Sequence, residues 1–301
     1  MNKLVYIKHD DIDFKKWDAT ILSSAIPFVF AQSFYLNATC PNWDALVINN
    51  YESVFPIPQK VKFGFKYLPQ PPFTSQLGAY GKLNLDIEQQ FYDYIISHYK
   101  LIDLELNVSN QIKSSSISPK NTFSFRYKDG YTLNQNSKRN ITKSKGLGFK
   151  VVQVNENESL KLSRNLLNPF LINELKLATS TVLLFDQLLI NAINHKMLYT
   201  FKVIDESQQI KAMAHFICNG KHALYLKGTN FDKLDNSGSM HLLMMHAIQF
   251  FENKAEFFDF GGGSKAGLAS FYAGFGGKPM TYSFLQINRL SPLIKFIKSK
   301  I

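Results

Sequence analysis

Apolar and polar positions alternate most regularly in the second half of the chain. Residues 148–154 are rich in β-branched side chains and predict a strand. Two stretches with a helical apolar period follow at about 157–178 and 182–195, separated by the cluster Thr179–Ser180–Thr181. The pattern then predicts these elements: strands at 197–205, 209–219 and 222–230, a helix from Met240, a strand at 256–262, a helix at about 265–275 and a strand at 281–289.

The first half repeats part of this order more faintly. Residues 44–60 predict two strands about a turn, 87–99 a helix, and 101–107 a strand with a central aspartate, as in 256–262. The segment 131–148 is polar and punctuated by glycine, and a helical stretch begins near Asn136. We therefore expect two copies of one architecture, with domains at 1–147 and 148–301.

Composition narrows the class of protein. The chain has 301 residues, of which 45% are hydrophobic and only 19% charged, so it is too apolar for intrinsic disorder. Its net charge of +11 favours anionic partners, which include nucleotides, phosphorylated substrates, RNA and lipid surfaces. Two stretches, 131–155 and the chain after Asp259, contain basic residues and no acidic ones, and the alternative is that they form solvated basic faces.

The cysteine content and the apolar runs indicate the cellular compartment in which the protein is expected. Cys40 and Cys218 are too few for a disulfide framework or a four-thiolate zinc site, and we expect a cytoplasmic protein. The sequence shows neither a membrane-spanning run nor a signal peptide. The last twelve residues, LSPLIKFIKSKI, predict an amphipathic helix suited to a membrane surface or to docking on its own domain.

Several motifs that suggest other functions are incomplete. Gly261, Gly263 and Ala266 fit a dinucleotide-binding glycine pattern, but no acidic residue follows Asp259 to bind a ribose. Ser264 at a strand-to-helix turn lacks a downstream acid and histidine.

Histidine spacing gives no metal site. His241 and His246 are five residues apart on a predicted helix, about 140° around its axis, and cannot share one ion. His215 and His222 straddle a predicted hairpin and could approach each other, but no third ligand is evident. We expect no metal.

Two motifs, NQNSKRNITKSKGLGFKV (134–151) and EFFDFGGGSKAGLASFYAGFGG (256–277), resemble the FemAB family. The first is similar to its basic helix-then-strand junction, with Lys138 and Arg139 where paired arginines are usual. The second is similar to its aspartate–aromatic–glycine strand end. The run 71–76, Pro-Pro-Phe-Thr-Ser-Gln, resembles GNAT-like relatives of the family. The resemblance implies an α/β (α+β) fold with two GNAT-like domains in tandem, each a mixed, mostly antiparallel sheet flanked by helices and splayed between its fourth and fifth strands.

The resemblance also implies a site for an acyl donor at a helix start. A pyrophosphate needs free backbone N–H groups in a small, neutral first turn, which Asn236, Ser237, Gly238 and Ser239 provide, with Thr229 and Asn230 on the preceding strand. The alternative is that Ser237 or Ser239 only caps the helix. The matching helix of the first half opens with Asp86 and Glu88, whose carboxylates would already fill such a site.

The same resemblance directs attention to candidate catalytic and acceptor residues. Asp259 and Tyr225 are possible contributors to proton transfer, and Asp259 is alternatively a structural partner of the glycine-rich backbone after it. Strand alternation predicts that Tyr225, Lys227 and Thr229 share one face. We expect the acceptor to lie in a cleft between the domains, where the candidate residues are Pro72, Phe73, Gln76, Lys138, Arg139 and Lys227. The alternative is that the proline-aromatic loop at 71–76 serves packing between the domains.

The predicted function is N-acyl transfer, in which an acyl or aminoacyl group moves onto a primary amine and forms an amide. The co-substrate would be acyl-CoA or aminoacyl-tRNA, with no tightly bound cofactor. The acceptor would be a small molecule or a cell-envelope precursor; tRNA is a further possible partner and DNA is not expected. The alternative is a non-catalytic, degenerate GNAT pair that binds an anionic ligand or RNA.

Overall fold

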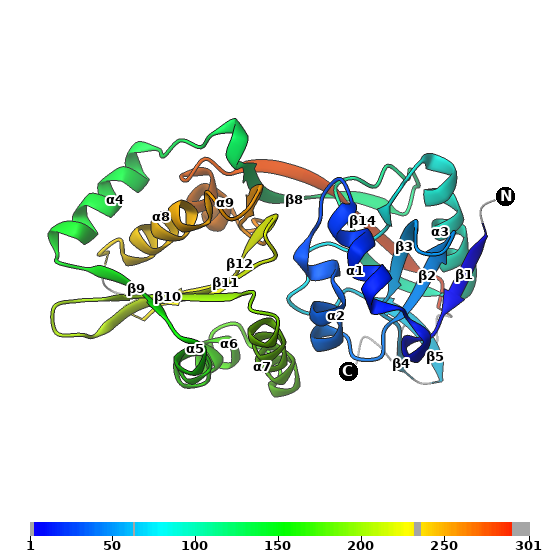
Figure 1. The fold of residues 1–301 in the computed structure, drawn as a ribbon, viewed down its shortest axis with the longest axis horizontal. Coiled ribbons are helices and arrows are strands. Elements are labelled where there is room, and N and C mark those ends of the chain that lie inside the picture. The colour runs from blue at the N-terminus through cyan, green and yellow to red at the C-terminus, as the bar shows by residue number, and fades with distance from the viewer. Residues whose placement is uncertain (1–2, 63, 232–235, 291–301) are drawn as a thin grey trace. The chain divides into compact units, whose positions relative to one another are not determined.

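The computed structural model describes residues 3–62, 64–231 and 236–290, and the chain divides into two compact units (Figure 1). Unit 1 comprises Met1–Lys120 and Thr281–Ile301, and unit 2 comprises Asn121–Met280. The compact units therefore do not divide at residue 147, where the sequence pattern places the boundary.

Strand pairing explains this difference. The last strand, β14 (Lys278–Asn288), pairs antiparallel with β7 (Leu101–Leu106) through its residues 283–288, so the C-terminal strand completes unit 1. The end of β8 (Ile117–Arg126) pairs antiparallel with β13 (Phe257–Asp259) and belongs to unit 2. The first half of the sequence thus supplies the end of β8 to unit 2, and the second half supplies β14 to unit 1.

In its described residues, unit 1 contains two groups of strands and three α-helices. β1, β2, β3 and β6 form an antiparallel sheet, β4 and β5 form a hairpin, and β5 runs parallel to β7. The remaining bounds are β1 (Leu4–Ile7), α1 (Phe14–Ser23), α2 (Ser33–Thr39), β2 (Asp44–Ile48), β3 (Ser53–Ile57), β4 (Lys60–Lys62), β5 (Phe65–Pro69), β6 (Tyr80–Gly81) and α3 (Leu85–His98), with 3-10 turns at His9–Asp11 and Val29–Ala31. Apolar side chains of α3 pack with those of β2, β3, β7 and β14 in one core.

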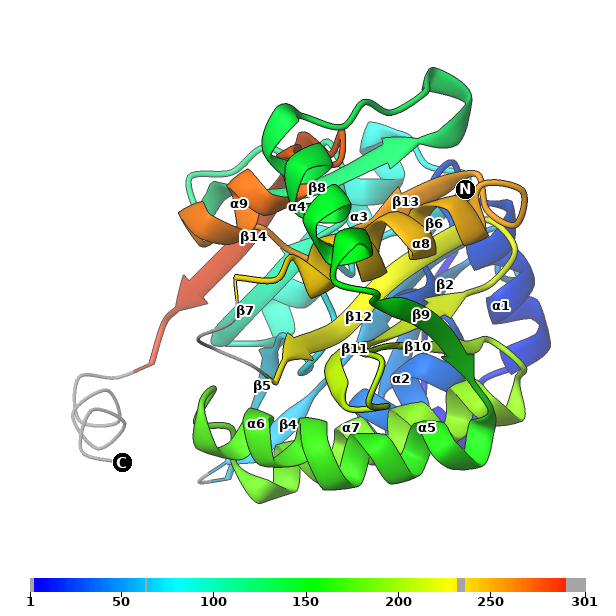
Figure 2. The ribbon, with the colours of Figure 1, turned by 90° about the vertical axis from the view of Figure 1, so that its left-hand side faces the viewer.

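Unit 2 has a mixed sheet with the strand order β8, β13, β12, β11, β10, β9. Its remaining bounds are α4 (Gln135–Gly146), β9 (Lys150–Val154), α5 (Glu156–Leu162), a π-helical turn (Ser163–Leu167), α6 (Asn168–Asn173), α7 (Thr179–Asn194), β10 (Leu198–Ile204), β11 (Ile210–Cys218), β12 (His222–Asn230), α8 (Ser239–Phe251) and α9 (Ala266–Ala273), with a 3-10 turn at Tyr127–Asp129. Figure 2 shows α4 and α8 on one face of strands β9 to β12 and α5, α6 and α7 on the other.

The order β9-α-α-β10-β11-β12-α8-β13-α9-β14 agrees with the predicted one, with one difference inside the first helical stretch. The predicted helix at 157–178 is interrupted by the π-helical turn Ser163–Leu167 and ends at Asn173. Pro169 lies in the first turn of α6, where its missing N–H would break an uninterrupted helical ladder. A π-helical turn before the proline absorbs this irregularity.

A buried aromatic cluster joins α8 to the sheet of unit 2. Phe216 of β11 lies 5.7 Å from Phe251 of α8 and 6.1 Å from Phe258 of β13, measured between ring centroids. All three rings are almost completely buried. This core fixes the position of α8, and therefore of its first turn, relative to β12.

Within the described part of the chain, no helix is both long enough and apolar enough to cross a membrane. The predicted amphipathic segment after Leu290 lies outside the described residues.

A buried carboxylate in unit 1 yields a test of the fold. The helix α3 begins with Asn84 as its N-cap, which accepts a hydrogen bond from the Ile87 N–H, so Asp86 and Glu88 do not cap it. Glu88 Oε2 instead accepts hydrogen bonds from the backbone N–H groups of Gln111 (2.7 Å) and Ile112 (3.1 Å). Burial raises the pKa of the Glu88 carboxyl.

We expect Glu88→Ala to lower the free energy of unfolding by about 2–4 kcal/mol, because two buried N–H groups lose their acceptor. Glu88→Gln keeps an acceptor oxygen and carries no charge. Since the folded-state pKa of Glu88 is raised, its stabilising contribution is complete below its unfolded pKa and is lost as the pH rises through the folded value. In urea unfolding between about pH 4 and about pH 8, the free energy of unfolding of Glu88→Gln should therefore increase relative to that of the wild type as the pH rises. A pH-independent difference would contradict this account.

Candidate functional site

The sheet of unit 2 opens between β12 and β13. These strands run parallel and pair only through three positions, from His222 opposite Phe257 to Leu224 opposite Asp259. β12 then continues to Asn230, whereas the segment that follows β13 turns away from it at Gly261, which has φ +67°. Among the described residues, β12 beyond Leu224 has no partner strand on this side. Its backbone N–H and C=O groups there can bind a ligand.

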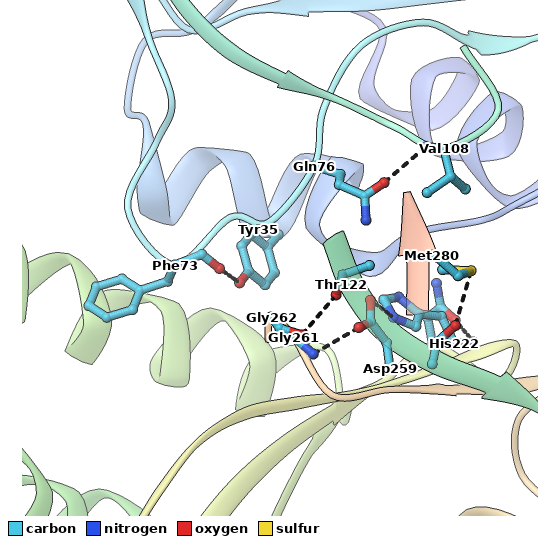
Figure 3. Close-up of polar contacts among 12 residues, drawn as sticks. Tyr35, Phe73, Gln76, Val108, Thr122, His222, Asp259, Gly261, Gly262 and Met280 are labelled. Carbon is cyan, nitrogen blue, oxygen red and sulfur yellow. Dashed lines mark hydrogen bonds and ion pairs between the residues drawn. The ribbon is translucent and has the colours of Figure 1, made fainter. Parts of the chain in front are cut away.

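Gly261 lies where the opening begins. A Cβ at this residue would lie 2.6 Å from the carbonyl oxygen of Tyr225, so only glycine allows the turn to approach β12 this closely. Asp259 stabilises the same turn, because its Oδ1 accepts a hydrogen bond from the Gly261 N–H at 2.8 Å. The other carboxylate oxygen lies 3.2 Å from His222 Nε2, and both side chains are fully buried (Figure 3).

A β-bulge in β12 changes which side chains share a face. Tyr225 pairs with Phe216 and Lys227 with His215, so Leu226 is an extra residue without a partner on β11. Because directly paired residues lie on the same face, Tyr225 shares the α8 face with Phe216, and Lys227 shares the opposite face with His215. The prediction that Tyr225, Lys227 and Thr229 share one face is therefore wrong.

The first turn of α8 begins at a glycine. The N-cap position is Gly238, at φ +76°, and Ser237 Oγ accepts a hydrogen bond from the Ser239 N–H at 3.4 Å, so Ser237 caps one N–H group from the residue before the N-cap. A Cβ at Gly238 would lie 2.3 Å from the backbone oxygen of Asn140. Ser239 Oγ donates to Asn230 Oδ1 at 3.1 Å and links the helix start to the end of β12. The remaining N–H groups of this turn and the helix dipole make this end of α8 suited to an anion.

A cavity of about 370 Å³ joins the strand opening to the start of α8. Five predicted residues line it: Tyr225, Thr229, Asn230, Asn236 and Gly238. Ser237 and Ser239 are buried and do not line it. The remaining lining residues are Gly228, Met240, His241, Leu268, Phe271 and Tyr272.

Three lining side chains have perturbed pKa values. Burial, with a smaller contribution from neighbouring Tyr272, raises the pKa of Tyr225 far above its ordinary value, so its hydroxyl stays protonated at neutral pH. Burial, with a smaller contribution from Asp259, likewise raises the pKa of Tyr272. Burial also lowers the pKa of His241, whose ring packs edge-on against Phe271 at 4.9 Å between centroids. The cavity therefore presents two neutral phenols and a neutral imidazole.

Lys227 lies on the other side of the sheet from Tyr225. Burial lowers the pKa of its ammonium group, and the positive charge of Lys265 lowers it further. It does not line the cavity.

The histidines of β11 and β12 do not meet. His215 pairs with Lys227, and its Nδ1 lies 2.7 Å from Thr200 Oγ1, whereas His222 lies beside Asp259. Within the described residues, no group of three or more histidine, cysteine, aspartate or glutamate side chains could hold a metal ion.

The predicted acceptor residues are divided between the units. Pro72, Phe73 and Gln76 belong to unit 1, where Gln76 is fully buried and its Oε1 accepts from the Val108 N–H at 2.9 Å. The carbonyl oxygen of Phe73 accepts a hydrogen bond from the Tyr35 hydroxyl (Figure 3). Lys138 and Arg139 belong to unit 2 and are exposed on α4. Their role in binding an acceptor stays a prediction.

Sequence reasoning missed the cavity residues on α8 and α9. Met240 begins a strongly apolar predicted helix, and Leu268, Phe271 and Tyr272 fall on a helix without a clear polar face. Their spacing of three and four residues is the signal that could have grouped them on one side of α9.

Comparisons with known proteins identify the fold. No protein-family model matches the sequence, and no curated protein matches it. FemX superposes with a TM-score of 0.69 at 11% identity, over 98% of this chain and 100% of that chain. The C-terminal domain of a putative lysylphosphatidylglycerol synthetase from Agrobacterium fabrum superposes with a TM-score of 0.58 at 10% identity, over 96% of each chain.

A tandem GNAT protein from the clavulanic acid biosynthesis pathway, solved without acetyl-CoA, gives a TM-score of 0.52 at 11% identity over 94% of this chain and 97% of that chain. The chain thus has a tandem GNAT-like fold of the FemX kind, and the predicted fold class is confirmed.

The glycine at the start of α8 provides a test of the site. We expect Gly238→Ala to lower the free energy of unfolding by at least about 1 kcal/mol, because alanine is strained at positive φ. Contact of the new Cβ with the Asn140 carbonyl adds to this loss. Gly146→Ala, at the end of α4, is the matched control, since its Cβ meets no atom within 4 Å. Thermal unfolding of both variants measures the difference, and equal stability would show that the tight approach at Gly238 does not exist.

Proposed function

We propose that the protein is an N-acyltransferase that moves an acyl group from acyl-CoA onto a primary amine. The observation that carries this proposal is the cavity at the opening of β12 and β13, which reaches the start of α8 at Gly238. An acyl-CoA has a pyrophosphate that suits the helix start and an amide-containing arm that suits the free edge of β12. The fold shared with the tandem GNAT protein supports this donor class.

The reaction requires no bound cofactor. The amine nitrogen attacks the thioester carbonyl carbon, an amide C–N bond forms and the C–S bond breaks. The attacking nitrogen loses a proton, and the leaving thiolate takes one, which the Tyr225 hydroxyl in the cavity is suited to donate. Burial raises the pKa of this phenol, so its hydroxyl is protonated when the thiolate forms beside it and can donate a hydrogen bond to the sulfur.

Asp259 has a different place in this proposal. Its carboxylate is fully buried and accepts the Gly261 N–H, so it positions the turn at which β13 leaves β12. We therefore assign protonation of the leaving thiolate to Tyr225 and a positioning role to Asp259.

An aminoacyl-tRNA is the second donor class. The FemX fold and the net charge of +11 favour it. The amine would then attack an ester carbonyl, and the leaving group would be a ribose hydroxyl.

Donor binding is the first measurement. A ligand at 100 times its dissociation constant stabilises a protein by ~2.7 kcal/mol, so thermal unfolding should shift with the correct donor. We expect a shift with acetyl-CoA or longer acyl-CoAs and a smaller one with free CoA. A shift with charged tRNA alone would move the proposal to the aminoacyl donor. No shift with any donor would contradict acyl transfer at this cavity.

The role of Tyr225 is tested by Tyr225→Phe. Loss of a general acid costs about 100-fold to 10,000-fold in turnover, and we expect the donor-binding shift to persist because the ring remains. Tyr199→Phe is the matched control, since Tyr199 packs against Phe250 and Phe251 and does not line the cavity. Turnover is followed as thiol release with a panel of primary amines. Unchanged turnover in Tyr225→Phe would remove this residue from the chemistry.

One feature of the cavity favours a non-catalytic binding module as the alternative. Its described lining contains no carboxylate to accept the proton of the amine. A protein that shows the donor-binding shift but releases no thiol with any amine would fit this alternative.

A further inference from the structure

A second cavity in unit 2, of about 620 Å³, lies between α4, α8 and β9. It shares no lining residue with the cavity at the start of α8. Its volume is within the range of about 300–1,000 Å³ that is typical of small-molecule sites. We call it the α4–α8 groove, and its lining residues are Leu133, Lys138, Ile141, Thr142, Lys145, Phe149, Val151, Leu242, Met245, His246 and Gln249.

Both helices present one continuous face to the groove. On α4 the lining residues are Lys138, Ile141, Thr142 and Lys145, and on α8 they follow the same spacing of three, four and seven residues from Leu242. This spacing places each set on a single side of its helix.

The floor of the groove is apolar. Ile141 of α4 and Leu242 of α8 are buried, while Phe149, Val151 and Met245 are half-buried. Apolar side chains that are left partly open to solvent in a concave site gain free energy when an apolar ligand covers them, by about 25 cal/mol for each Å² removed from water.

The charged side chains that line the groove are all positive. Lys138 and Lys145 are exposed, and the described lining contains no aspartate or glutamate. The two lysines are seven residues apart, which separates their Cα atoms by about 10.5 Å along the helix. Burial lowers the pKa of His246, so its ring is neutral and adds no charge at neutral pH. The positive charge therefore comes from the α4 side.

We propose that the α4–α8 groove binds a single aliphatic chain that ends in an anionic head. The chain covers Ile141, Phe149 and Leu242, and the head pairs with the ammonium group of Lys138 or Lys145. A small inorganic anion would leave the apolar floor uncovered, and a neutral or cationic chain would leave the two lysines without a partner.

Titration calorimetry of the full chain with dodecanoate, below its micelle concentration, tests this proposal. Dodecanol and dodecyltrimethylammonium supply the same chain with a neutral and a cationic head. We expect dodecanoate to bind about fivefold more tightly than either, since an ion pair with an exposed ammonium group is worth up to about 1 kcal/mol. Decanoate should bind more weakly, by about fourfold for each methylene lost, because one buried methylene contributes about 0.8 kcal/mol.

Variants locate the site. Lys138→Gln with Lys145→Gln should weaken dodecanoate binding by about fivefold and leave dodecanol binding unchanged. Lys150→Gln is the matched control, because Lys150 is exposed on β9 outside the groove. Met245→Trp should abolish binding of both chains by filling the groove, and circular dichroism checks that this variant folds.

Three outcomes would overturn the proposal. Equal binding of dodecanoate and dodecyltrimethylammonium would indicate a non-selective apolar surface. Unchanged affinity in the double lysine variant or in Met245→Trp would place any binding elsewhere. Binding to anionic phospholipid vesicles without binding of free dodecanoate would indicate contact with a membrane surface instead of a site for a single chain.

Discussion

The candidate site depends on the short parallel ladder between β12 and β13. After three paired positions the ladder ends at Leu224 and Asp259, and the chain turns at Gly261 against the Tyr225 carbonyl. A longer ladder would pair the free edge of β12 and leave no room for the cavity. The buried contact between Asp259 and His222, together with the Gly261 N–H, holds the end of the ladder at this position.

The other end of the cavity is fixed by a second close backbone approach. Gly238 allows the start of α8 to lie against Asn140 of α4, and Lys143 of α4 donates a hydrogen bond to the Asn236 carbonyl. The aromatic core of Phe216, Phe251 and Phe258 fixes the same helix on the sheet. Packing at both ends of α8 therefore fixes the direction of the N–H groups in its first turn, and no ligand is needed to position them.

Local patterns predicted the strands and helices from β9 to β14 and the start of α8 to within one residue of Ser239. They also predicted an alternative structural role for Asp259, which its buried contacts support. They did not predict the bulge at Leu226, because an extra residue leaves the composition of a strand unchanged while moving Lys227 to the other face. They did not predict β8 either, because its first half contains Pro119, Lys120 and Asn121, which are unfavourable in strands. Which strand completes which unit depends on contacts between residues more than 130 positions apart, and the period of apolar residues carries no information on such contacts.

The placement of β14 has a consequence for the order of folding. Strand β7 pairs along one edge with residues 283–288, so unit 1 cannot complete its sheet until almost the whole described chain has been synthesised. Unit 2 requires only residues up to Met280 and can close first. During synthesis the edge of β7 stays open while some 175 residues follow it (from Leu106 to Thr281), and an open edge can pair with another chain. Arg289, immediately after β14, donates to the backbone oxygens of α3 and Tyr99, so the end of the returning strand is held in place at the moment this edge is covered.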